Sequence, residues 1–223
     1  MKDTVRLIEV KEDILADNVK MAADLNEQLT KSRTFLMNLM ASPGAGKTST
    51  ILATLEKITG DLNVGVMEAD IDSKVDAEKI AAAGTEAIQI RTGGFCHMDA
   101  TMVKTGLDAM DCSRFDLVIL ENVGNLVCPA EFATGAHLNA MILSVPEGDD
   151  KPLKYPLMFA VCQVLLVNKI DFLELTDFNM DLFKQRVYAI NPHITIFEIS
   201  ARTGQGIDAW ADWLKARVKK VIG

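Results

Sequence analysis

One short segment restricts the fold of this chain more than any other: A-S-P-G-A-G-K-T, residues 41–48. An apolar run, residues 35–39, ends just before it, and a helical pattern begins just after it. A loop between a buried strand and a helix points backbone N–H groups and the positive end of the helix dipole at one place, which suits a phosphate group. The segment therefore predicts a strand, a phosphate-binding loop and a helix.

This loop differs at one position from the pattern G-x-x-x-x-G-K-[ST], because Ala41 replaces the first glycine. A methyl group is tolerated there if Ala41 keeps a negative φ, whereas Gly46 beside the phosphates has less freedom. We expect Lys47 to reach the β- and γ-phosphates and Thr48 to ligate Mg²⁺. The alternative is a glycine-rich turn that happens to precede a lysine. The predicted phosphate contacts are Pro43, Gly44, Ala45, Gly46, Lys47, Thr48 and Ser49.

The rest of the chain alternates short apolar runs with helical patterns. This alternation predicts an α/β fold, a mostly parallel sheet of about seven strands flanked by helices. Apolar residues at helical spacing predict an amphipathic helix at residues 10–32, packed on or beside a single domain that comprises residues 1–223. The apolar stripe expected to pack against the domain consists of Ile14, Leu15, Val19, Ala22, Leu25 and Leu29. The expected strands lie near residues 35–40, 62–68, 86–90, 115–121, 140–145, 162–168 and 194–199.

Composition argues against several kinds of partner. The formal net charge is −8, and no stretch gathers enough Lys and Arg for a basic face, so we expect neither nucleic-acid nor membrane binding. The start lacks a secretory pattern and the longest apolar stretch, residues 157–167, is too short to span a bilayer, so we expect a cytoplasmic protein. In that compartment the four cysteines are thiols, core residues or metal ligands rather than disulfides.

A second motif predicts which base is bound. Asn168, Lys169 and Asp171 form an N-K-x-D sequence at the end of an apolar run, where ligands bind in parallel sheets. An aspartate there accepts hydrogen bonds from guanine N1–H and N2–H₂, whereas adenine would leave the buried carboxylate unpaired. Ser200 and Ala201, after the next expected strand, resemble the segment that supports base contacts in GTPases. A solvated charged turn is the alternative.

Acidic residues follow two other expected strands. Asp70 and Asp76 follow the second strand, and Glu121 ends the fourth. Carboxylates at these ends are placed to bind Mg²⁺, directly or through water, and to orient the attacking water. We therefore expect these three residues to act with Lys47 and Thr48 in catalysis, and we expect Thr48, Asp76 and Glu121 to hold Mg²⁺. For each carboxylate, a helix-capping or solvated position is the alternative.

Cys96, His97 and Cys128 are candidate ligands of a second metal. They lie in loops at the same edge of the expected sheet, and two thiolates with an imidazole suit Zn²⁺ or Ni²⁺. No C-x-x-C pair is present and one chain supplies only three ligands, so core or capping roles stay open, and a second protomer could complete the coordination. Structural roles are expected for Cys112, Cys162, His137 and His193.

Five segments together resemble the HypB family, the nickel-incorporation GTPases of NiFe-hydrogenase maturation. The resemblance covers roughly residues 10–205. It implies a P-loop NTPase fold, binding of GTP and GDP, and a homodimer that depends on nucleotide. It also implies delivery of Ni²⁺ to the hydrogenase large-subunit precursor complex, with a small zinc-containing hydrogenase accessory protein as partner. The segments are A-S-P-G-A-G-K-T at 41–48, C-H-M-D-A at 96–100, E-N-V-G-N-L-V-C-P at 121–129, S-V-P-E-G-D-D-K at 144–151 and N-K-I-D at 168–171.

The same resemblance implies that Cys96, His97 and Cys128 bind Ni²⁺ or Zn²⁺ at a dimer interface. Gly94-Phe95 replaces the acidic residue common in the family, and the family's C-x-x-C-G-C motif and histidine-rich tract are absent, so we expect a transient site rather than nickel storage. Glu121 and Cys128 are joined by a short segment that contains Gly124, which predicts that nucleotide state changes metal affinity. No glutamine is evident to orient water, so intrinsic hydrolysis should be slow.

Three other functions compete with this one. A urease-accessory GTPase also carries nickel, but its relatives have Cys-Pro-His where this chain has Cys128-Pro129-Ala130. An ATP-dependent metabolic kinase is disfavoured by the N-K-x-D sequence. A metal-binding or adaptor protein that keeps nucleotide only for structure would bind GTP without sustained phosphate release.

Overall fold

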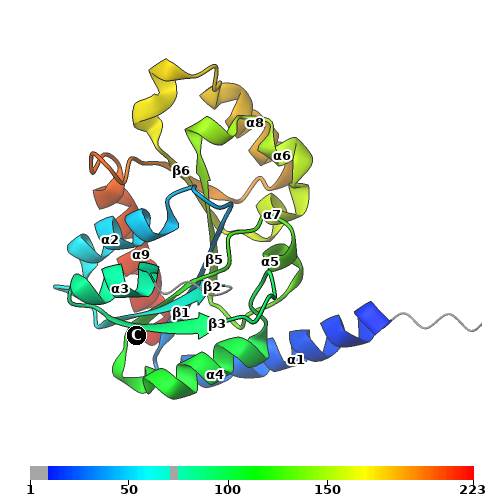
Figure 1. Ribbon diagram of the computed structural model, residues 1–223, viewed down its shortest axis with the longest axis vertical. Helices are drawn as coiled ribbons and strands as arrows, with labels where there is room; N and C mark the ends of the chain where they lie inside the picture. Colours follow the sequence, from blue (N-terminus) through cyan, green and yellow to red (C-terminus); the bar gives the residue numbers. More distant parts are fainter. Residues whose placement is uncertain (1–9, 71–74) are drawn as a thin grey trace, which may run out of the picture.

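The computed structural model describes residues 10–70 and 75–223. Its centre is a seven-stranded sheet in the order β3-β2-β4-β1-β5-β6-β7, and every pair of neighbouring strands is parallel (Figure 1). The predicted fold class is confirmed, and each expected strand has an observed counterpart. The strands are β1 (Phe35–Ala41), β2 (Val64–Asp70), β3 (Glu86–Arg91), β4 (Leu117–Glu121), β5 (Leu138–Ser144), β6 (Val164–Asn168) and β7 (Thr195–Glu198).

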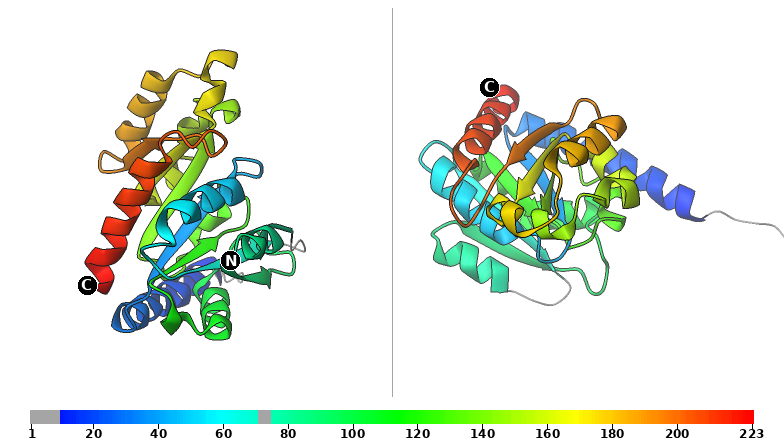
Figure 2. Two further views of the ribbon diagram at one scale, coloured as in Figure 1. Left: turned by 90° about the vertical axis from the view of Figure 1, so that its left-hand side faces the viewer. Right: turned by 90° about the horizontal axis from the view of Figure 1, so that it is seen from above.

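Helices cover both faces of this sheet (Figures 1 and 2). One face packs against α2, α3 and α9, and the other against α1, α4, α7 and α8. Each strand-to-strand connection must cross over the sheet, which is why parallel strands need helices between them. The helices are α1 (Val10–Lys31), α2 (Lys47–Ile58), α3 (Val75–Ala82), α4 (Ala100–Met110), α5 (Cys128–Glu131), α6 (Lys151–Lys154), α7 (Pro156–Val161), α8 (Met180–Ile190) and α9 (Ile207–Ile222). Short 3₁₀ turns are η1 (Cys112–Arg114), η2 (Val145–Glu147) and η3 (Ile170–Leu175).

The strand β1 shows how the two faces are built. All seven of its residues are buried, because both faces of the sheet are covered. Met37 and Leu39 point into the same core as α2 and α9, whereas Leu36 and Met40 point to the opposite face. Trp210 in α9 is 1% exposed and donates a hydrogen bond to Thr54 Oγ1 of α2 at 3.0 Å, so it is a core residue that joins the two helices.

The amino-terminal helix α1 agrees with the predicted range but not with the whole predicted apolar stripe. Val19 was expected to face the domain, and this is wrong, because its side chain is 57% exposed. Asn18 takes the buried position instead, since its amide donates to Ala133 O at 2.9 Å and its oxygen accepts from Ala100 N at 2.9 Å. Among the α1 side chains that the structure describes, residues 15–31, the buried apolar ones are Ala22, Leu25 and Leu29.

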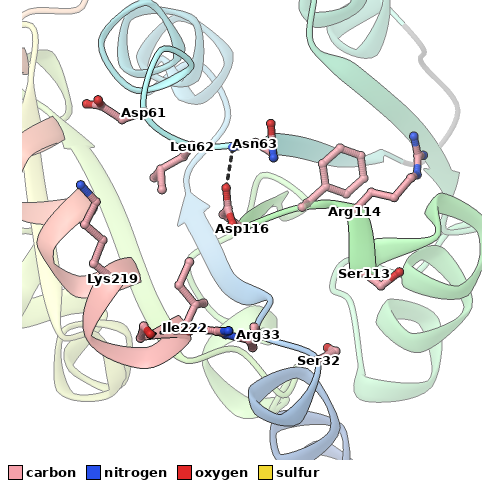
Figure 3. A pocket seen from close by; sticks show the side chains of 12 residues that line it. Ser32, Arg33, Asp61, Leu62, Asn63, Ser113, Arg114, Asp116, Lys219 and Ile222 are labelled. Atoms are coloured by element: carbon pink, nitrogen blue, oxygen red, sulfur yellow. Dashed lines mark hydrogen bonds between the residues drawn. The ribbon is translucent and has the colours of Figure 1, made fainter.

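The amino ends of the strands lie away from the predicted sites. A hollow of about 670 Å³ lies there, between the C-terminal turn of α9 and the loops before β1, β2 and β4 (Figure 3). Arg33 closes one side by donating to Ile222 O at 2.6 Å, and Asn63 N donates to Asp116 at 2.8 Å. Its described lining contains none of the predicted site residues.

Within residues 10–70 and 75–223, no helix is both long and apolar enough to cross a bilayer. That the chain is a single domain stays a prediction.

Candidate functional site

The expected phosphate loop joins β1 to α2 at the carboxyl edge of the sheet. Ala41 is the last residue of β1 and is fully buried, and positive φ angles in the described non-glycine residues occur elsewhere, so the condition for its methyl group is met. Gly46 adopts φ 98° at the start of α2, and a Cβ atom there would lie 2.6 Å from Asn168 Nδ2. Glycine is therefore needed at position 46 for two reasons, its backbone conformation and its close neighbour.

The N-K-x-D sequence packs directly on this loop. Asn168 Nδ2 donates to Ala45 O at 2.9 Å, and Lys169 Nζ donates to Gly44 O at 2.7 Å. Asn168 Oδ1 in turn accepts from Ala201 N at 3.1 Å. Because the carboxyl ends of β1 and β6 meet at one edge, the two motifs that were found separately in the sequence form one structure.

Asp171 is held as an acceptor. Ser200 Oγ donates to Asp171 Oδ1 at 2.6 Å, and Arg202 forms an ion pair with its other oxygen at 2.9 Å. The hydrogen bond from Ser200 lowers the pKa of Asp171, and the Arg202 charge acts in the same direction. The carboxylate is therefore ionised at neutral pH, and it can only accept hydrogen bonds.

Two buried carboxyl groups lie beside the phosphate loop. Glu68 of β2 and Glu121 of β4 are opposite each other in the register of the sheet. Thr48 Oγ1 donates to Glu121 Oε1 at 3.2 Å, and Lys47 Nζ is 3.9 Å from the same oxygen. Burial raises the pKa of Glu68 to about 10, with a further contribution from the Glu121 charge, and burial also raises the pKa of Glu121.

Lys47 and Glu68 line a small cavity of about 60 Å³ together with the three carboxylates predicted to bind Mg²⁺ or orient water, which are Asp70, Asp76 and Glu121. Thr48 is joined to this cavity through its hydrogen bond to Glu121. Asp70 is exposed at the end of β2, and Asp76 lies in the first turn of α3, where it accepts from Lys79 Nζ at 2.8 Å. Glu68 Oε1 and Glu121 Oε2 are buried without a hydrogen-bond partner among the described residues. A cluster of carboxylate and hydroxyl oxygens with unused acceptors fits Mg²⁺, which prefers oxygen ligands.

Cys96, His97 and Cys128 come together as predicted. Their ligand atoms all lie within 4.8 Å of one another, and Cys96 Sγ is 2.9 Å from Cys128 Sγ. Burial lowers the pKa of His97 from its usual 6.5, so the imidazole is neutral at pH 7 and keeps a lone pair for a metal. The hydrogen bond with Cys96 and partial burial raise the pKa of Cys128, and a metal would have to displace its proton.

Aromatic and apolar side chains surround this cluster. Phe132, just after α5, stacks on His97 with ring centroids 3.7 Å apart and an interplanar angle of 17°. The stacked ring covers one face of the imidazole and restricts its rotation. Phe95 and Val127 flank the thiols and remain 56% and 51% exposed. The three candidate ligands therefore sit at the surface within an apolar surround.

The segment from Glu121 to Cys128 connects the two candidate sites. A Cβ atom on Gly124 would lie 3.1 to 3.3 Å from atoms of Pro43, so the segment passes closely over the phosphate loop. Asn125 N donates to Ala41 O at 2.9 Å, and three residues later Cys128 begins α5. The short connection expected from the sequence is therefore a packed contact.

Comparison with known proteins identifies the family. Residues 35–198 match the family described as "CobW/HypB/UreG, nucleotide-binding domain". Hydrogenase maturation factor HypB of Rhizobium leguminosarum bv. viciae is 40% identical over 210 residues, which is 94% of this chain and 70% of the relative. The chain belongs to the HypB family. The Escherichia coli K12 factor is 39% identical over 95% of this chain and 73% of its own length. Hydrogenase/urease maturation factor HypB of Helicobacter pylori J99 is 36% identical over 93% of this chain and 86% of its own length.

Solved structures agree with this membership. HypB from Helicobacter pylori in complex with nickel superposes with a TM-score of 0.87 at 33% identity, covering 92% of this chain and 96% of that one. HypB from Archaeoglobus fulgidus superposes with a TM-score of 0.85 at 36% identity, covering 91% of this chain and 99% of that one. The signal recognition particle receptor FtsY from Elizabethkingia anophelis with GDP, at 0.56 and 13% identity, covers 91% of this chain and 76% of that one and shares the fold alone.

Several residues of this HypB-family chain that touch the candidate sites were not selected from the sequence. Glu68 had a signal, because it is a lone charge inside the apolar run of β2. Glu147 accepts from Ser144 N and Oγ, each at 2.7 Å, and from Ser42 Oγ in the phosphate loop. Asn125 was quoted only as part of the 121–129 segment, and Phe132 carried no signal, since the contacts of both depend on neighbours that only the folded chain supplies.

Proposed function

We propose that this HypB-family chain is a GTP-hydrolysing metallochaperone or regulator that assists nickel insertion into the NiFe-hydrogenase large-subunit precursor. The observation that carries the proposal is the segment from Glu121 to Cys128, which joins the cavity beside the phosphate loop to the Cys96, His97 and Cys128 cluster. The relative from Helicobacter pylori whose structure holds nickel is 33% identical, which supports nickel as the cargo.

Guanine recognition rests on Asp171. Its ionised oxygens, held by Ser200 and Arg202, match the two donors of guanine N1–H and N2–H₂, and adenine offers no such pair. Asn168 and Lys169 brace the loop whose backbone, from Pro43 to Ser49, would bind the phosphates. GTP and GDP are therefore the proposed nucleotides.

Hydrolysis would use the oxygen-lined cavity. Thr48, Asp76 and Glu121 would hold Mg²⁺, and bound Mg²⁺ would neutralise charge that develops on the transferred phosphoryl group. Lys47 would bind the β- and γ-phosphates, and Asp70 would orient water. We expect slow turnover, because the amide nitrogen of Gln89, which lines this cavity, is bonded to Glu68 O at 3.2 Å and Ile90 O at 3.3 Å.

The metal step depends on an incomplete ligand set. One chain brings three ligands, and a nickel or zinc ion takes a fourth, so we propose that a second protomer or an incoming partner supplies it. The exposed Phe95 and Val127 offer apolar surface for a homodimer that forms with nucleotide. The small zinc-containing hydrogenase accessory protein and the large-subunit precursor complex are the proposed partners in delivery.

Loss of the γ-phosphate would then release the ion. The close contact of Gly124 with Pro43 would transmit a loop movement to the segment that ends at Cys128. A displaced thiolate lowers metal affinity, and by linkage the metal must change nucleotide affinity by the same factor.

The test is Ni²⁺ and Zn²⁺ affinity, with oligomeric mass, for protein that holds GDP or a non-hydrolysable GTP analogue. We expect both affinity and mass to change with nucleotide, and the affinity change to vanish in Cys128→Ala. Cys112→Ala is the matched control, because Cys112 is a free thiol in η1, outside the cluster. Equal nickel affinity in both nucleotide states would defeat the proposed switch.

A nucleotide-binding metal adaptor without turnover is the second candidate, since the slow hydrolysis expected here approaches it. Sustained phosphate release from GTP separates the two. Delivery to urease is a further possibility, because the Helicobacter pylori relative is named a hydrogenase/urease factor. Nickel transfer to each purified apoenzyme would distinguish these targets.

A further inference from the structure

Asn125 makes contacts on both sides of the connection between the phosphate loop and the metal cluster. Its backbone N–H donates to the carbonyl of Ala41, the last residue of β1 before the loop, at 2.9 Å. Its side chain reaches the other way: Nδ2 donates to Cys96 O at 3.4 Å, and Oδ1 accepts from Val127 N at 2.8 Å. Each side-chain partner is in, or directly beside, a cysteine of the cluster.

Asn122, three residues before Asn125, is held in place by several hydrogen bonds. Asn122 is fully buried, and its oxygen accepts from Met98 N at 3.2 Å and from Val123 N at 2.9 Å. Its Nδ2 donates to Asn38 Oδ1 of β1 at 3.0 Å. Gly124 then packs against the phosphate loop. Because Asn122 is held in place, a movement of the phosphate loop would act on the residues that follow it. Asn125 is the residue that contacts both Ala41, at the start of the loop, and the backbone beside the two cysteines.

We infer that Asn125 is the positioning residue through which nucleotide state and the metal cluster act on each other. The inference deepens the proposed function and rests on its nucleotide-coupled metal site. A shift of the Ala41 carbonyl moves the Asn125 backbone, and the side chain passes the shift to the backbone of Cys96 and Val127. The two thiols then change their separation.

The two side-chain bonds differ in strength. The bond to Val127 N has ordinary length, whereas the bond to Cys96 O, at 3.4 Å, is longer than the usual range of about 2.7–3.2 Å and is the weaker of the two. Groups that hold metal ligands in place change metal affinity without touching the ion. The Cys96 contact is therefore the one that distinguishes the two nucleotide states.

The test compares the ratio of nickel dissociation constants with GDP and with a non-hydrolysable GTP analogue. In the native protein we expect a ratio of at least about fivefold. Asn125→Ala keeps the backbone bond to Ala41 O but removes both side-chain bonds, and should bring the ratio to within about twofold of one. Asn125→Asp keeps the acceptor for Val127 N and loses the donor to Cys96 O, so it should lose the coupling as well.

Asn63→Ala is the matched control. Asn63 is exposed before β2, at the opposite end of the sheet, and its change should leave the ratio as in the native protein (Figure 3). GTP affinity measured without metal checks that each variant folds. If Asn125→Ala does not fold, the ratio measured in Asn125→Asp decides the test. A native ratio in both Asn125 variants overturns the inference and spares the proposed function. A ratio of one in the native protein overturns the switch itself, and the inference with it.

Discussion

Replacing Glu68 by glutamine is expected to stabilise the nucleotide-free protein at neutral pH. Glu68 is 3% exposed, and burial, helped by the Glu121 charge, raises its pKa from 4.5 to about 10. The folded protein therefore keeps Glu68 protonated at pH 7. Glutamine has nearly the same shape and, like a protonated carboxyl group, can both donate and accept hydrogen bonds, so Glu68→Gln removes only the ionisation.

Proton linkage gives the sign and the size of the expected change in the free energy of unfolding. Above pH 4.5 the unfolded chain releases a proton that the folded protein retains up to a pKa of about 10, so the free energy of unfolding falls as pH rises through this window. Each pH unit above the unfolded pKa costs about 1.4 kcal/mol, which sets an upper limit of about 3 kcal/mol at pH 7. Because Glu121 shares the site, we expect a gain of about 1–3 kcal/mol in Glu68→Gln. Below pH 4.5 the gain should disappear, because both states are then protonated.

Urea unfolding without Mg²⁺ or nucleotide measures this gain at pH 5 and at pH 7.5, and Glu56→Gln in an exposed position of α2 is the control, with an expected change below about 0.5 kcal/mol. A Glu68→Gln protein that is less stable than the native one at pH 7.5, or that gains equally at both pH values, would refute the reasoning. Phosphate release from GTP should fall in the same variant, since a neutral amide replaces a carboxyl group that Mg²⁺ could ionise.

Three further predictions concern other contacts. Asp171→Asn should lower GTP affinity by about 100-fold or more in competition binding, because charge-assisted hydrogen bonds to the base contribute about 1.5–3 kcal/mol each; unchanged affinity would show that Asp171 does not read the base. Phe132→Leu should weaken Ni²⁺ binding by about tenfold in calorimetry and leave nucleotide binding unchanged, because His97 loses the ring that orients it; an equal loss of both affinities would indicate misfolding instead. Asn18→Ala should lower the free energy of unfolding by about 1–3 kcal/mol in urea titrations, since two backbone groups lose their partner. A change below about 0.5 kcal/mol would show that the two hydrogen bonds of Asn18 do not stabilise the fold.

Motifs with local geometry were predicted well. The strand, loop and helix around residues 41–48 depend on neighbours in sequence, so the pattern alone placed them, including the tolerance of Ala41. The meeting of Cys96 and Cys128 also followed from sequence, because both follow strands of a parallel sheet and such strands end at one edge. The roles of these residues in binding and turnover stay predictions.

Choices among similar residues were predicted less well. In α1 the apolar period indicated Val19 as buried, but the neighbouring Asn18 is buried instead, because it satisfies two distant backbone groups. Among the acidic residues, Glu68 was passed over although it is the most deeply buried of those that line the cavity. Periodicity reports which face is apolar, and it does not report which polar group finds a partner.

The sequence by itself therefore determined the layered fold, the strand, loop and helix around residues 41–48, the N-K-x-D motif and the identity of the three candidate metal ligands, since each depends on local order and residue chemistry. Only the tertiary structure decided that Glu68 and Glu121 share one buried site, that Phe132 covers His97, and that Asn125 links Ala41 to Cys96. These contacts join residues far apart in the chain. Their geometry depends on how strands register and loops close, which no short stretch of sequence specifies.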